Sequence, residues 1–240
     1  SGAATAAAAA LLCVAAPANA QIAACAIPDR LPTPKVDAQR NASQRRIVPI
    51  DSYILTLSWS PQHCANARPR DAFQCEARDN RFGFILHGLW PQGGNGDWPQ
   101  YCRAAQPLPV AVLRSNLCAT PSVDLLQHEW SKHGTCADRS PERYFDKARG
   151  LYGRVRFPDM AKLAARDDLT VQSFSAAFLA ANARSLVGLT TRHLHVRLTR
   201  DGWLDEVWLC VDRQMRFSAC RKGQGSGAAP QRRMTIRAVN

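Results

Sequence analysis

Eight cysteines, distributed from Cys25 to Cys220, constrain the fold of this 240-residue chain more than any other feature. They follow an alanine- and leucine-rich start that ends in Ala18-Asn19-Ala20, the small-x-small pattern of a signal-peptidase site. Export would remove Cys13 with residues 1–20 and leave an even set of cysteines in an oxidising compartment. Because none of the eight forms a C-x-x-C pair, we expect disulfide bonds and not structural zinc.

The chain is expected to have three parts. Residues 1–20 read as a signal peptide, and we expect the sequence to begin partway through it, because neither an initiator Met nor a basic segment precedes the apolar run. Residues 21–48 are proline-containing and predicted to form an irregular N-terminal arm, and residues 49–240 one folded domain. The apolar run is too short and too alanine-rich for a membrane span. We therefore expect an exported protein, periplasmic or extracellular.

Alternation of large apolar side chains predicts strands near both ends of the domain. In residues 53–59 one face of a half-buried strand carries Tyr53, Leu55, Leu57 and Trp59. A second strand is expected to end at His87, before a glycine- and proline-rich loop from Gly88 to Pro99. Helices are then expected at 121–133, 141–152 and 173–183, and strands at 192–199, 204–211 and 232–238. This order indicates an α+β domain with an antiparallel sheet.

The segment "HEWSKHGTC", residues 128–136, concentrates ionisable side chains on the first predicted helix. We expect Thr120 to cap that helix and Gly134 to end it. At about 100° per residue from His128, the other three charged positions fall in one broad sector: Lys132 near 40°, Glu129 near 100° and His133 near 140°. A carboxylate beside one imidazole, with positive charge nearby, suits proton transfer next to an anion.

Two other interpretations of this cluster stay open. A zinc site of the H-E-x-x-H type needs histidines four residues apart, whereas here the spacing is five and a lysine between them would oppose a cation. A solvated helix face with ordinary ion pairs is the other alternative. The stretch "FILHGLWPQ" favours catalysis, because His87 precedes a loop able to hold a ligand. Two histidines on different elements are what in-line phosphoryl transfer to a neighbouring hydroxyl needs.

The charge of the chain points to a polyanionic partner. The formal net charge is +12 and the isoelectric point is about 9.7. Nucleic acid is the first candidate and an anionic membrane surface the second. A basic secreted protein without an anionic ligand would have the same charge.

The two histidine motifs, "FILHGLWP" and "HEWSKHGTC", resemble the active-site signatures of the ribonuclease T2 family, secreted endoribonucleases that need no metal. Further similar segments are "YILTLSWSPQHC", "DWPQYC" and "WLCVDRQMRFSAC". The resemblance implies a ribonuclease T2-like catalytic domain over residues 49–240. It also implies cleavage of single-stranded RNA through a 2′,3′-cyclic phosphate, without a cofactor and with broad base specificity.

The resemblance further implies roles for individual residues. His133 would act as general base on the ribose 2′-hydroxyl and His87 as general acid on the departing 5′-oxygen. Glu129 and Lys132 would support the pentacovalent phosphate. His128 would bind phosphate, and Trp90 would stack on a base.

The resemblance also implies the disulfides Cys64–Cys75, Cys102–Cys136 and Cys210–Cys220. Cys25 and Cys118 remain, and we pair them by elimination. With no clear dimerisation signal, a monomer is expected. Two rival functions remain: a non-catalytic nucleic-acid or cell-surface binding protein with the same fold, and a metal-dependent hydrolase that a chelator would silence.

Overall fold

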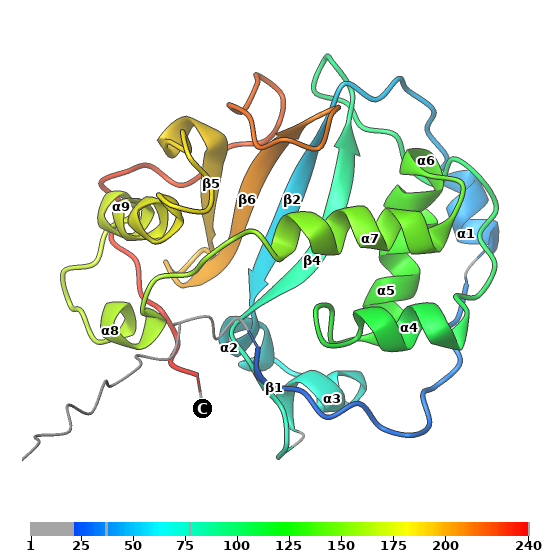
Figure 1. Cartoon of the computed structure of the whole chain (residues 1–240), viewed down its shortest axis with the longest axis horizontal. Coiled ribbons are helices and arrows are strands. Elements are labelled where there is room, and N and C mark those ends of the chain that lie inside the picture. The colour runs from blue at the N-terminus through cyan, green and yellow to red at the C-terminus, as the bar shows by residue number, and fades with distance from the viewer. Residues whose placement is uncertain (1–21, 37, 77, 240) are drawn as a thin grey trace, which may run out of the picture.

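The computed structural model describes residues 22–36, 38–76 and 78–239, and its centre is a four-stranded antiparallel sheet (Figure 1). The strand order is β4-β2-β6-β5. The strands are β2 (Ser52–Trp59), β4 (Phe84–Gln92), β5 (Leu194–Leu198) and β6 (Leu204–Asp212). The predicted α+β class with an antiparallel sheet is confirmed. A separate pair joins β1 (Ile22–Ala24) to β3 (Arg81–Phe82).

Most of the helices lie between β4 and β5 in the chain. The helical elements are α1 (Ala38–Ser43), α2 (Ser60–Cys64), η1 (Pro69–Asp71), α3 (Ala72–Cys75), α4 (Val110–Asn116), α5 (Val123–Glu129), η2 (Trp130–Gly134), α6 (Thr135–Ala137), α7 (Pro141–Tyr152), α8 (Met160–Ala164), α9 (Val171–Asn182) and η3 (Thr191–His193). In Figure 1, α7 crosses the sheet, α4 and α5 lie towards β4, and α8 and α9 lie towards β5. Within the described ranges, no helix combines the length and the apolarity needed to cross a membrane.

Three sequence predictions concern the two ends of the chain: the signal, the N-terminal arm and the last strand. The predicted signal, residues 1–20, lies outside the described residues. The arm expected to be irregular contains β1 and α1. The strand expected at 232–238 is wrong, because this segment makes only isolated bridges, through Arg233 and Thr235.

One face of the sheet forms the hydrophobic core beneath α7. Tyr53, Leu55, Leu57 and Trp59 are all buried on this face, as the alternation predicts. From α7, the hydroxyls of Tyr144 and Tyr152 donate hydrogen bonds to the carbonyls of Leu89 (3.0 Å) and Phe84 (2.7 Å). Successive side chains of a strand point to opposite faces. The intervening positions of β2 and β6 therefore lie on the face away from α7.

The strand that carries His87 is longer than predicted and contains a β-bulge. It continues through the expected loop to Gln92, so the predicted end at His87 is wrong. Thr56 pairs with Gly88 while Leu57 pairs with Leu86, which leaves His87 as the extra residue. The bulge shifts the alternation by one residue, so that Leu86 and Leu89 both pack in the core. His87 is thereby re-aimed in mid-strand.

The helix of the second motif also departs from its predicted ends. Its cap is Ser122, whose hydroxyl accepts a hydrogen bond from the Leu125 amide at 3.2 Å. Thr120 instead donates to the Leu86 carbonyl at 2.6 Å and so ties the helix start to β4. Beyond Glu129 the backbone widens into the π-helical turn η2 and continues as α6, past the predicted end at Gly134.

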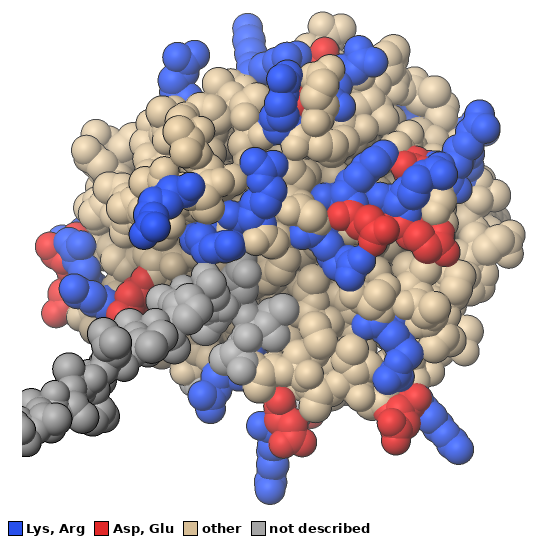
Figure 2. Space-filling model, in the orientation of Figure 1, with Lys and Arg blue, Asp and Glu red and all other residues tan. Residues whose placement is uncertain are grey.

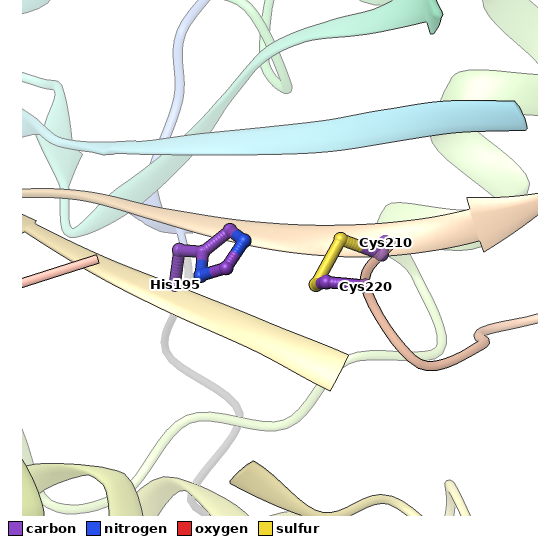
Figure 3. Close-up of side chains that lie close together, drawn as sticks. All are labelled: His195, Cys210 and Cys220. Carbon is purple, nitrogen blue, oxygen red and sulfur yellow. A yellow bond between two sulfur atoms is a disulfide. The ribbon is translucent and has the colours of Figure 1, made fainter. Parts of the chain in front are cut away.

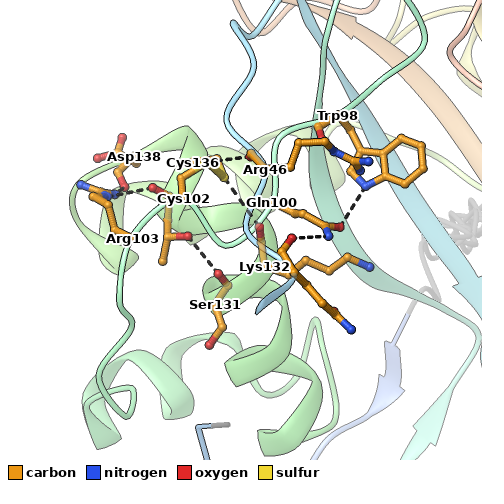
Figure 4. Close-up of a disulfide and its surroundings, with 11 residues drawn as sticks. Arg46, Trp98, Gln100, Cys102, Arg103, Ser131, Lys132, Cys136 and Asp138 are labelled. Carbon is orange, nitrogen blue, oxygen red and sulfur yellow. Dashed lines mark hydrogen bonds between the residues drawn. A yellow bond between two sulfur atoms is a disulfide. The ribbon is translucent and has the colours of Figure 1, made fainter. Parts of the chain in front are cut away.

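The described residues form four disulfide bonds, and they are the four expected pairs: Cys25–Cys118, Cys64–Cys75, Cys102–Cys136 and Cys210–Cys220. Cys102–Cys136 joins the loop after β4 to α6 (Figure 4). Beside it, the Tyr101 amide donates to the Lys132 carbonyl at 2.8 Å and Arg103 Nε donates to the Thr135 carbonyl at 2.8 Å. This loop therefore holds η2 and α6 from outside the helix.

Loop length gives a prediction for the disulfides. Cys25–Cys118 closes a loop of sequence separation 93, against 11 for Cys64–Cys75. If chain entropy dominates, replacing both cysteines of the longer pair by serine should lower the free energy of unfolding by about 5 kcal/mol, and the matched replacement of the shorter pair by about 3 kcal/mol. Urea unfolding of the two double variants measures both. Equal losses, or a larger loss for the shorter loop, would contradict the entropic account.

Candidate active site

The site forms where α5 approaches the edge strand β4 at Gly88. A Cβ atom on Gly88 would lie 1.9 Å from Glu129 Oε2, so no larger residue fits while Glu129 stays in place. Trp90 Nε1 donates a hydrogen bond of 2.8 Å to the same Oε2. The other oxygen, Oε1, lies 3.6 Å from His87 Nε2. Glu129 is only 1% exposed. It belongs to the second motif and contacts Trp90 and His87 of the first motif.

The second ring nitrogen of His87 faces the carboxylate of Glu206, which stands on β6, beyond β2 in the sheet. His87 Nδ1 lies 2.7 Å from Glu206 Oε1 and 3.0 Å from Ser58 Oγ. Ser58 Oγ donates to Glu206 Oε1 at 2.8 Å, and Trp208 Nε1 donates to Glu206 Oε2 at 2.7 Å. Sequence reasoning missed all three of these residues. They lie in predicted strands, but only the strand register, which pairs Ser58 with Glu206, indicates that they meet.

His133 lies on the other side of Trp90. The His133 and Trp90 rings stack with centroids 5.5 Å apart and an interplanar angle of 24°. His133 is 4% exposed, and its Nδ1 has no hydrogen-bond partner among the described residues. Together with Lys132, it lines a cavity of about 290 Å³ whose walls include Trp90, Trp98 and Trp208.

His128 lines a different cavity, of about 350 Å³, which it shares with His87 and Ser58. The four ionisable residues of the second motif were predicted to project into one sector: His128, Glu129, Lys132 and His133. The structure instead places Lys132 and His133 at one cavity and His128 at another. The π-helical turn begins directly after Glu129, and its i→i+5 hydrogen bonds change the angular position of Lys132 and His133 from that of an α-helix. His87 lines the cavity of His128, Trp90 lines that of His133, and Glu129 contacts both residues, so these three residues are called the wall between the cavities.

Opposite charges surround the two catalytic candidates. For His87, whose side chain is 27% exposed, burial lowers the pKa, but the hydrogen bond to Glu206 and the charges of Glu129 and Glu206 outweigh it, so the pKa is raised. For His133, burial and then the charge of Lys132 hold the pKa well below 6.5. The surroundings therefore favour the protonated form of His87 and the neutral form of His133.

The other two ionisable groups of the second motif are also shifted. Burial raises the pKa of Glu129 to about 7, against the opposing effects of His87 and the Trp90 hydrogen bond. Burial lowers the pKa of His128 to about 4, with smaller contributions in the same direction from the charges of Lys132 and His87. Glu129 therefore titrates near neutrality, whereas His128 is neutral at pH values well above 4.

One group of residues in the described ranges has the spacing of a metal site, and it lies away from this wall. It consists of His195, Cys210 and Cys220 (Figure 3). Cys210 and Cys220 are bonded to each other, so their sulfurs are not thiolates and cannot act as metal ligands in this form. We therefore do not interpret the group as a metal centre.

Comparison with known proteins identifies the family of the chain. Residues 50–220 match the model of the ribonuclease T2 family. The chain belongs to the ribonuclease T2 family. Both histidine motifs, and all the residues discussed above at the wall between the cavities, lie inside the matched region.

Named relatives of this ribonuclease T2 family member include two bacterial proteins. A probable ribonuclease from Haemophilus influenzae is 38% identical over 139 residues, which are 52% of this chain and 50% of that protein. A ribonuclease from Aeromonas hydrophila is 34% identical over 168 residues, 68% of this chain and 73% of that protein. The chain thus spans only half the length of the first relative and about three quarters of the second.

Solved structures share the fold at low identity. RNase NT in complex with 5′-AMP has a TM-score of 0.59 and 21% identity, over 78% of this chain and 99% of that one. An RNase-related protein from Calystegia sepium has a TM-score of 0.57 and 22% identity, over 77% of this chain and 96% of that one. The ribonuclease T2-like fold predicted from the motifs is confirmed.

The close approach at Gly88 gives a prediction with a matched control. Gly88→Ala should displace Glu129 and lower any activity of the site by about 100-fold or more, because misplacement by an ångström can cost that much. Gly94→Ala, whose added Cβ would meet no atom within 4 Å, should leave activity unchanged. Steady-state rates and melting temperatures of both variants provide the measurement. A fully active Gly88→Ala would show that the position of Glu129 does not matter.

Proposed function

We propose that the protein is an endoribonuclease that cleaves single-stranded RNA by transesterification and leaves a 2′,3′-cyclic phosphate. The observation that carries this proposal is the pair of imidazoles in opposite electrostatic environments, His87 among carboxylates and His133 beside Lys132. When two titratable groups have their pKa values pushed apart, the environment itself indicates which is acid and which is base.

The proposed first step uses His133 as base and His87 as acid. Neutral His133 accepts the proton of the ribose 2′-hydroxyl, and the 2′-oxygen attacks the adjacent phosphorus. The bond from phosphorus to the 5′-oxygen breaks, and protonated His87 gives its proton to that leaving oxygen. One proton is taken up and one is released, so the step balances without a metal ion or a cofactor.

Glu129, Lys132 and His128 are proposed to stabilise the phosphate during this step. Lys132 offers a positive charge to the crowded phosphorane. Glu129, with its pKa of about 7, is partly protonated near neutrality and can then donate a hydrogen bond to a non-bridging oxygen. His128, with its pKa of about 4, would contact phosphate as a neutral N–H donor.

Trp90 is proposed to stack on a base. One part of its indole is covered by His133, and Trp90 also lines the 290 Å³ cavity, where aromatic walls suit any base. This supports broad base specificity. Basic side chains are scattered over the face that carries α7 and do not gather at one place on it (Figure 2), so the net charge of +12 attracts RNA without by itself selecting the site.

We also propose where the enzyme acts, as what oligomer, and with what metal requirement. The signal-like start and four disulfides favour export to the periplasm or the medium. We propose a monomer that acts without a metal. The two rivals, a binding protein and a metal-dependent hydrolase, are outcomes of the following test.

The test is cleavage of RNA by the disulfide-intact protein in excess EDTA, with analysis of the product ends. We expect 2′,3′-cyclic phosphate ends, and a loss of about 10²–10⁴-fold in His133→Ala, because a positioned acid or base contributes that much. His193→Ala, which replaces a histidine outside both cavities, is the matched control and should keep full activity. A folded wild type without cleavage would favour the binding protein. Activity abolished by EDTA would favour the metal-dependent enzyme.

A second prediction concerns pH. The base must be neutral and the acid protonated. Because the pKa of His133 lies well below 6.5, kcat/KM should persist as pH falls below 6.5. Above 6.5 it should fall in two contributions: loss of the proton of Glu129, whose pKa is about 7, and loss of the proton of His87, whose pKa is raised.

Profiles of kcat/KM against pH for a dinucleotide substrate measure both limits. His133→Ala should lose the acid limb, and His87→Ala should lose its own part of the alkaline limb and keep the part that belongs to Glu129. An alkaline limb that survives unchanged in His87→Ala would contradict the assignment of His87 as acid.

A further inference from the structure

We propose that Glu206 is a positioning residue for the reaction: its carboxylate holds the proton of His87 on Nδ1 and directs Nε2 towards the substrate. This inference rests on the proposed function for its consequence in catalysis, but the contact between the two residues is independent of it. No motif in the sequence draws attention to Glu206, which is the third residue of β6, on the far side of β2 from His87.

The geometry of Glu206 is that of a fixed group. Its Oε1 accepts from Ser58 Oγ at 2.8 Å and lies 2.7 Å from His87 Nδ1, while its Oε2 accepts from Trp208 Nε1 at 2.7 Å. Its side chain is 15% exposed. It stands on a sheet strand paired on both sides, a more rigid support than a loop.

The chemistry of the contact fixes the tautomer of His87. The hydrogen bonds that Glu206 receives lower its pKa against the effect of burial, so it is ionised and can only accept. A hydrogen bond between it and His87 therefore requires a proton on Nδ1. Nε2 is then the one nitrogen of His87 that exchanges a proton during the reaction. It lies 3.6 Å from Glu129 Oε1.

Several charged groups act on His87 besides Glu206, and a test must separate them. From β6, α5 and η2 these are Asp205, His128, Glu129, Lys132 and His133. The carboxylates favour the protonated ring, and the cations oppose it. Glu206 differs from Asp205 in combining its charge with direct contact, since Asp205 is the exposed neighbour on the same strand.

The experiment compares Glu206→Gln with Asp205→Asn. The glutamine keeps the shape of the side chain and an accepting oxygen but removes the charge. We expect kcat to fall about 10–100-fold, the loss seen when a metal-ligating histidine is deprived of its hydrogen-bonded partner. The alkaline limb of kcat/KM should also move to lower pH. Asp205→Asn removes the same charge without this contact and should change both quantities much less.

An activity-independent measurement accompanies the kinetics. Titration of the His87 imidazole by NMR should show a lower pKa in Glu206→Gln than in the wild type, with matching melting temperatures confirming that both are folded. A third variant, Ser58→Ala, retains the charge but removes one donor to Glu206, so it should reduce kcat with little movement of the alkaline limb.

The outcomes separate the two proposals. If the His87 titration and the alkaline limb are the same in Glu206→Gln as in the wild type, the positioning role is overturned even though RNA is cleaved. If the wild type cleaves no RNA, the proposed function fails, while a lowered His87 titration in Glu206→Gln would still support the link to Glu206. A titration that does not move would then overturn that link as well.

Discussion

The approach of α5 to β4 at Gly88 sets the distance between the two halves of the site. The absence of a side chain at this position allows Glu129 to contact both Trp90 and His87. The helix is held in that place by hydrogen bonds at its start, from Thr120 to Leu86, and by a disulfide near its end. Most of what the site can do follows from this buried carboxylate between two elements distant in sequence.

As a consequence, carboxylates lie beside one histidine of the site and a cation lies beside the other. On one side, His87 lies between the carboxylates of Glu129 and Glu206; on the other, His133 is buried beside Lys132. Two identical side chains thereby acquire opposite preferences for the proton. The tryptophan between them contacts both rings, edge-on at His87 and stacked at His133. Such opposite preferences are what the proposed general acid and general base need in order to coexist at one pH.

Much of this could be predicted from the sequence, and the rest depends on long-range geometry. Alternation located β2 and the core face of Tyr53, and the two motifs located His87 and His133. The bulge at His87 and the π-helical turn after Glu129 could not be predicted, because each is one extra residue accommodated by packing against a partner. Glu206 was missed for a related reason: an acidic residue in a strand has no local signature, and its role depends on the register of β2 with β6.

The most direct test of this account is a crystal structure with a dinucleotide whose ribose 2′-hydroxyl is replaced by fluorine, which prevents attack but marks its position. We expect the scissile phosphate to lie beside Glu129 and Lys132, with the fluorine next to the His133 imidazole and the 5′-oxygen within hydrogen-bond distance of His87 Nε2. A phosphate bound elsewhere, or the two ribose positions exchanged between the histidines, would contradict it.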